Sequence, residues 1–105
     1  MEKIVLPRYL RSSTRKWVRR VLDTWQLEGH HVKLLITAGE CWDRILEARE
    51  QVARDGPYFT DRWGAPRSHP ALRDERDGRI AFARLLRELS LSEQPPDPRP
   101  PRLRS

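Results

Sequence analysis

The chain has 105 residues, of which 37% are hydrophobic and 34% are charged, and its formal net charge is +6. This length allows one small domain, and no apolar run approaches the roughly 20 residues that a membrane-spanning helix needs. The single cysteine, Cys41, excludes an internal disulfide framework and a cysteine-rich zinc site, and the N-terminal apolar stretch is too short for a secretory signal peptide.

The excess positive charge lies at the N-terminus. The first 20 residues hold seven basic residues and one acidic residue, whereas the remaining 85 hold 14 of each. A concentrated positive field attracts polyanions, and nucleic acid is the polyanion that we expect here. The candidate DNA-binding residues are Lys3, Arg8, Arg11, Arg15, Lys16, Arg19 and Arg20.

Residues 1–12 are expected to form a flexible basic arm, followed by a helix from about residue 13 to Trp25. Hydroxyl side chains at residues 12–14 offer N-caps for this helix. One side of the helix is apolar and predicts a core or interface contact. The opposite side is basic and predicts contact with phosphates.

The segment from Gln26 to His30 breaks the pattern, and His31 to Asp55 predicts a long helix. Its apolar residues spread over an arc of about 200°, which is more than one neighbouring helix covers. We therefore expect a homo-oligomer that assembles through this helix, and a closed ring if the contacts are head-to-tail. The expected interface residues are Leu34, Ala38, Trp42, Ile45 and Val52.

Asp55-Gly56-Pro57 should end this helix, because glycine adopts the left-handed cap conformation and proline forbids continuation. Residues 58–68 are consistent with a loop or a short β-hairpin that turns near Trp63 and Gly64. A third helix is predicted from Pro70 to about Leu89, antiparallel to the long helix.

The third helix carries two further expectations. Gly78 weakens it by up to about 1 kcal/mol relative to alanine, so close packing or a bend is expected there. Arg49 and Glu75 lie within the apolar arcs of the two helices, and a charge buried between them must be paired. We therefore predict a salt bridge between these two side chains.

Residues 92–105 are expected to form a disordered tail, because five prolines fall among the last eleven residues and little apolar surface accompanies them. The tail is either a docking segment for a partner protein or an end without a role. Its candidate docking residues are Arg99, Arg102 and Arg104.

The sequence offers little chemistry. His30 and His31 are adjacent, so on a helix their side chains should diverge by about 100° rather than converge on a metal. His69 precedes a proline and is expected to anchor the loop to the third helix. Asp43 and Glu47 should be solvated or paired with neighbours such as Arg44 and Arg54.

The chain also lacks the glycine-rich motifs that bind nucleotides. We therefore expect no enzymatic activity, no cofactor and no metal. The enzyme hypothesis that remains is an accessory nuclease that uses His69 with Asp61 or Asp74.

An ordered set of short motifs covers residues 12–91. The set comprises Trp17, Trp42-Asp43-Arg44, Ala48-Arg49, Gly56, Asp61-Arg62-Trp63-Gly64, His69-Pro70-Ala71 and Ala83-Arg84-Leu85-Leu86-Arg87-Glu88-Leu89. In order and spacing it resembles the small subunits of tailed-phage DNA-packaging terminases, in the family with a central "DR", a "G" hairpin, an "HP" and a terminal "LLREL".

This resemblance implies a non-enzymatic, DNA-binding protein that forms a ring of more than four copies. It would recognise viral double-stranded DNA and regulate the large terminase subunit, which holds the ATPase and nuclease and to which the tail would dock. A phage or prophage origin and the bacterial host cytoplasm follow from the same resemblance. The family's DNA contacts are not fixed by a motif, so the candidate contacts above come from charge placement alone.

The sequence thus predicts an all-α subunit, with its helical domain at residues 13–91 and a short hairpin or loop insertion, that assembles as a homo-oligomeric ring. The alternative interpretation takes the first two helices as a helix-turn-helix, which would make the protein a dimeric transcriptional repressor or antitoxin.

Overall fold

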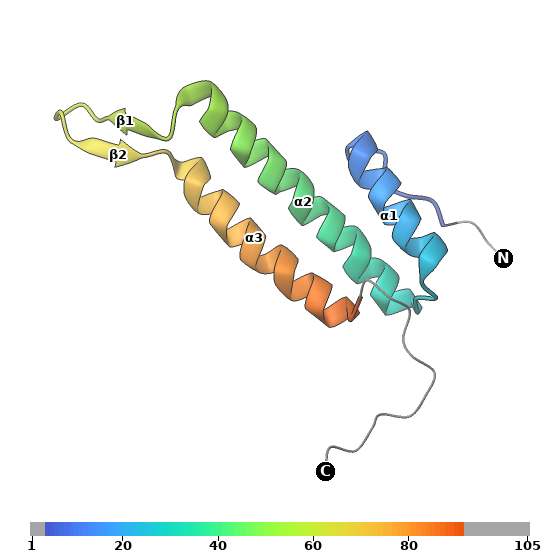
Figure 1. Ribbon diagram of the computed structural model, residues 1–105. Coiled ribbons are helices and arrows are strands. Elements are labelled where there is room, and N and C mark those ends of the chain that lie inside the picture. The colour runs from blue at the N-terminus through green and yellow to red at the C-terminus, as the bar shows by residue number, and fades with distance from the viewer. Residues whose placement is uncertain (1–3, 92–105) are drawn as a thin grey trace, which may run out of the picture.

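A computed structural model describes residues 4–91 and contains three α-helices and one β-hairpin (Figure 1). The helices are α1 (Ser12–Thr24), α2 (Gly29–Asp55) and α3 (Pro70–Leu89), and the strands are β1 (Tyr58–Thr60) and β2 (Pro66–Ser68). The predicted helical architecture is confirmed, and so is the hairpin. The long helix begins two residues earlier than expected, after Glu28 as its N-cap. Residues 92–105, including the candidate docking arginines of the tail, lie outside the described part.

The antiparallel helices α2 and α3 pack along most of their length (Figure 1). The two helices pack closely at Gly78, because a Cβ atom at this position would lie 2.8 Å from Cγ1 of Ile45. Further along the pair, the rings of Trp42 and Phe82 lie 5.3 Å apart between their centroids. The expectation of close packing at Gly78 is therefore confirmed.

The predicted pairing of Arg49 with Glu75 is also confirmed. Nε of Arg49 lies 2.9 Å from Oε1 of Glu75, and Nη2 of Arg79 lies 2.8 Å from the same oxygen. These two guanidinium groups lower the pKa of Glu75, and the hydrogen bond from Arg49 has the largest effect. The carboxylate is thus held ionised where the two helices meet.

The hairpin extends away from the helical pair at the end of α2 (Figure 1). Its strands pair antiparallel, with Phe59 opposite Arg67, and all six strand residues are exposed. Asp61 closes the turn by accepting the backbone N–H groups of Trp63 and Ala65, each at 2.9 Å. Gly64 has a φ of +82°, a backbone conformation that residues with a side chain rarely adopt. The turn therefore lies where the sequence predicts it.

The start of α1 differs from expectation. The N-cap residue is Arg11, whose own side chain makes no capping hydrogen bond, so the predicted capping by a hydroxyl of residues 12–14 is wrong. Residues 4–11 run back along the helices, where Leu6 and Leu10 are buried. Apolar contacts hold this segment, in contrast to the flexible arm that its charge suggested.

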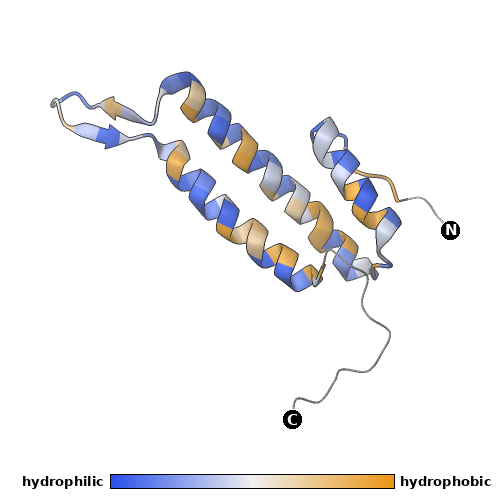
Figure 2. Cartoon of the chain, viewed as in Figure 1, coloured by the Kyte–Doolittle hydropathy of each residue, from blue (hydrophilic) through white to orange (hydrophobic). Residues whose placement is uncertain are grey.

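The core lies where α1, the first half of α2 and the end of α3 meet. Its buried residues are Leu6, Val18, Val21, Leu35 and Leu89, with partly buried tryptophans and leucines around them. Figure 2 shows hydrophobic residues interleaved with hydrophilic ones along each helix, as expected for amphipathic helices. Within residues 4–91, no helix combines the length and apolarity needed to cross a bilayer.

Replacing Gly78 with alanine tests the close approach of α2 and α3. Alanine has the better helix propensity, yet its Cβ would clash with the fully buried Ile45. We expect Gly78→Ala to lower the free energy of unfolding by about 1–2 kcal/mol in urea denaturation. Gly29→Ala is the matched control and should be neutral or stabilising, because nothing lies within 4 Å of its added Cβ. Equal stabilisation by both substitutions would contradict the packing.

Titration of Asp61 tests the turn. Its hydrogen bonds, chiefly that from the Ala65 N–H, lower the pKa of this carboxyl. The stability that Asp61 contributes is therefore complete above its ordinary pKa, and is lost as the pH falls through the lower folded value. In an NMR titration the amide signals of Trp63 and Ala65 should shift with a midpoint below about 3.9. The Asp61→Asn variant should lack this transition, and a midpoint at or above the ordinary value would exclude the hydrogen-bonded turn.

Candidate nucleic-acid interface

Four of the predicted DNA-binding residues line one open groove on the surface of α1. The groove has a volume of about 590 Å³, and the N-terminal segment Ile4–Leu6 forms its other wall. The charged residues that line it are Arg15, Lys16, Arg19, Arg20 and Asp23. We call this feature the basic groove. Four cations against one carboxylate give it a positive potential suited to anions.

A hydrogen bond joins the two walls of the basic groove. Nη2 of Arg19 donates to the backbone oxygen of Ile4 at 2.9 Å. The segment after Ile4 is held further along by the buried Leu6. This contact uses one N–H group of Arg19, and a guanidinium has five such donors.

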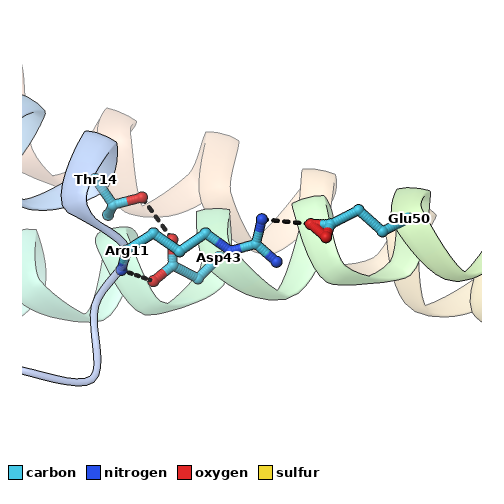
Figure 3. Close-up of polar contacts among 4 residues, drawn as sticks. All are labelled: Arg11, Thr14, Asp43 and Glu50. Atoms are coloured by element: carbon cyan, nitrogen blue, oxygen red, sulfur yellow. Dashed lines mark hydrogen bonds and ion pairs between the residues drawn. The ribbon is translucent and has the colours of Figure 1, made fainter.

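Asp43 of α2 holds the start of α1 in place. As Figure 3 shows, one of its carboxylate oxygens accepts the hydroxyl of Thr14, and the other accepts the backbone N–H of Arg11 at 2.9 Å. Thr14 is only 1% exposed, so its hydroxyl has no access to bulk water. The carboxylate of Asp43 therefore provides the cap that α1 lacks in its own sequence.

A glycine lets α1 approach α2 closely beside Asp43. A Cβ atom at Gly39 would lie 3.2 Å from Cγ2 of Thr14 and 3.3 Å from Cγ2 of Val18. Both of these α1 residues are buried. The buried side of α1 is thus fixed against α2, which leaves its basic side for the groove.

The other predicted cations are placed differently. The guanidinium of Arg11 forms an ion pair with Glu50, which raises the pKa of Arg11 (Figure 3). Arg8 is exposed but does not line the basic groove, and Lys3 lies outside the described residues. Of the candidate cations that the structure describes, only the four in the basic groove are therefore brought together.

The predicted oligomer interface needs correction. Ala38 and Ile45 are completely buried within their own chain, so neither offers surface to a second copy. Trp42 packs on Phe82, and Leu34 packs against the core. Val52 is half-buried. The physical reason is that α3 and α1 together cover most of the broad apolar arc of α2, which the sequence had assigned to neighbouring subunits.

The expected divergence of His30 and His31 is also wrong. Their rings lie 4.1 Å apart between centroids on the first turn of α2. With Glu28 they place three possible metal-binding atoms within 4.8 Å of one another. This group is largely exposed and lies at the positive end of the α2 dipole, which disfavours a cation, so we assign it no role.

His69 anchors the hairpin to α3, as expected. Its Nδ1 accepts the N–H of Ala71 at 3.0 Å, so Nε2 carries the proton and donates to Asp55, also at 3.0 Å. This hydrogen bond is the main cause that lowers the pKa of Asp55. The backbone N–H of His69 donates to the Pro57 oxygen at 2.7 Å, which closes the base of the hairpin. Both ring nitrogens are therefore engaged in structural contacts.

Sequence reasoning missed Asp43 and Gly39. Asp43 was expected in solvent or beside a neighbouring arginine, but it bonds to the start of α1, about 30 positions earlier. A signal was present in retrospect. Gly39 and Asp43 are four residues apart, so they lie on the same side of α2. There the glycine leaves room for a neighbouring helix, and the aspartate offers that helix a hydrogen-bond acceptor.

Comparison with known proteins adds no relative: no family model, no curated protein and no solved structure matches this chain.

Removing the Asp43 carboxylate should loosen α1. Asp43→Ala leaves the buried Thr14 hydroxyl and the Arg11 N–H without their acceptor, and we expect a loss of about 1–3 kcal/mol in the free energy of unfolding. Glu47→Ala, which removes an exposed carboxylate one turn further along, should cost less than about 0.5 kcal/mol. Urea denaturation measures both variants. Equal effects would show that Asp43 does not anchor the helix.

Proposed function

We propose that this protein is the non-catalytic, DNA-binding small subunit of a phage terminase, which binds viral double-stranded DNA and regulates the large subunit during genome packaging. The observation that carries the proposal is the gathering of Arg15, Lys16, Arg19 and Arg20 around one groove. The motif order that resembles this family supports it independently.

The chemistry of the basic groove suits the DNA backbone. Three of its four cations are arginines, whose planar guanidinium groups match phosphate oxygens in a bidentate manner. Contacts of this kind position a protein on DNA without reading its sequence. Binding through the groove alone should therefore be salt-dependent and only weakly selective.

A single basic groove makes few contacts, so the proposed mechanism needs several copies. Once one copy of an assembly has bound DNA, binding by the next copy becomes an intramolecular event. The overall affinity for DNA then rises although no copy makes a new kind of contact. A ring of more than four subunits would supply this gain. In the same proposal the tail, with Arg99, Arg102 and Arg104, docks the large subunit in the cytoplasm of a bacterial host.

Charge reversal in the basic groove tests the proposal. For the wild-type protein we expect log K for a DNA duplex to fall with log salt concentration with a slope of at least about 4. Arg15→Glu combined with Arg19→Glu should reduce this slope by about 2 and weaken binding strongly at low salt. Fluorescence anisotropy across a salt series measures both quantities.

The matched control reverses two arginines outside the groove. Arg54→Glu with Arg73→Glu changes the net charge equally, but both residues lie near the hairpin end of the helical pair. A control that lost as much affinity as the groove variant would show a general charge effect and contradict the site. Native mass spectrometry of the same samples gives the stoichiometry, and a dimer would favour the repressor or antitoxin alternative.

A further inference from the structure

The exposed tip of the hairpin has the composition of a protein-binding surface. Trp63 is 76% exposed, and Cζ of Arg62 lies 4.5 Å from the centroid of its ring. Tyr58 and Phe59 are also exposed on the adjoining strand. Tryptophan, tyrosine and arginine dominate the binding energy of protein interfaces, and an isolated two-stranded hairpin is only marginally stable in water.

The turn presents Arg62 and Trp63 in a fixed position. Asp61 accepts two backbone N–H groups within the turn and the Nε–H of Arg67 at 3.0 Å, so its carboxylate is not free to neutralise Arg62. The tip thus offers a guanidinium stacked on an indole ring.

A second groove lies between α2 and α3, with a volume of about 500 Å³. The residues that form its floor are small, namely Cys41, Ala48, Gly78 and Ala81, so they leave space between the longer side chains around them. None of the α2 residues that contact α1, such as Gly39 and Asp43, lines this groove. It is therefore open on a side of α2 that α1 does not cover.

The rim of this second groove is acidic. Three carboxylates, those of Glu47, Asp74 and Asp77, stand there against the single guanidinium of Arg44. Among residues 4–91, neither Glu47 nor Asp74 forms a salt bridge, and Asp77 is 3.9 Å from Nε of Arg76. We call this feature the acidic groove. Its negative charge is complementary to the guanidinium of Arg62 at the hairpin tip, and its apolar floor suits an aromatic ring.

We propose that the hairpin tip of one copy docks in the acidic groove of a second copy, with Trp63 on the small residues of the floor and Arg62 against Asp77. Both halves of this contact are on the same chain, which identifies the partner as a second copy. The contact is head-to-tail, because tip and groove are different surfaces, and repetition of such contacts generates rings or filaments. The inference rests on the self-association included in the proposed function, but it replaces the apolar side of α2 as the interface.

Cross-linking tests this contact, because Cys41 in the acidic groove is the only cysteine of the chain. The Ala65→Cys variant adds one thiol near the tip and keeps Arg62 and Trp63. Within one chain, Cys41 lies 14 residues before the end of α2, about 21 Å along the helix axis, so a short bismaleimide joins these two thiols only between copies. We expect a ladder of covalent dimers, trimers and higher species in denaturing gels.

Two controls use the same reagent. Ala65→Cys combined with Cys41→Ser should give no ladder, and Ser13→Cys on α1 should give far less of it than Ala65→Cys. Dimers that persist without Cys41 would indicate contact between two hairpins and would overturn the proposal. The proposal would also be overturned if native mass spectrometry showed oligomers that the reagent does not join.

A charge swap tests the pairing itself. Arg62→Asp alone and Asp77→Arg alone should each raise the dissociation constant of the assembly by at least about tenfold in sedimentation experiments. Together they should restore much of the wild-type affinity, because the pair is re-formed with opposite polarity. Two single losses that simply add would contradict direct pairing.

The outcome is independent of DNA binding. A protein that forms the ladder but does not bind DNA would contradict the proposed function and leave this contact intact. A protein that binds DNA through the basic groove and remains monomeric at all concentrations would overturn the contact alone.

Discussion

The carboxylate of Asp43 is the interaction on which the arrangement of this molecule depends. It accepts hydrogen bonds from the side chain of Thr14 and the backbone of Arg11, and Gly39 gives α1 the room to reach it. Without this junction α1 would be held mainly by apolar contacts, which fix position less strictly than directed hydrogen bonds. The basic groove exists because the other side of α1 is then free and faces the segment after Ile4.

Local patterns in the sequence were sufficient for the secondary structure. Gly56 and Pro57 ended α2, Pro70 began α3, and the salt bridge between Arg49 and Glu75 followed from the cost of leaving charges unpaired. Two features depended on tertiary contacts that no local pattern contains. The sequence could not show that Ala38 and Ile45 are buried within their own chain, nor that Leu6 and Leu10 return to the core. The sequence predicted that basic residues would gather on α1, but it did not predict that Ile4–Leu6 would form the second wall of the basic groove.

The two ends of the molecule differ in how they are stabilised. At the core end, three helices and the N-terminal segment surround the cluster of Val18 and Leu35. At the hairpin end, only α2 and α3 pack together, and polar contacts such as that of His69 with Asp55 complete the structure. The proposed functions follow this division, since DNA would bind at the first end and a second copy would contact the surfaces toward the other.

The long antiparallel pair of α2 and α3 also acts as a spacer between these ends. Because the core lies at one end and the hairpin at the other, paired insertions of seven residues in both helices would move the hairpin outward by about 10 Å while preserving which side chains face inward. Such a change would lengthen the reach of the hairpin without altering the residues of the basic groove. Helix length is therefore a single geometric variable that sets how far the hairpin tip stands from the basic groove.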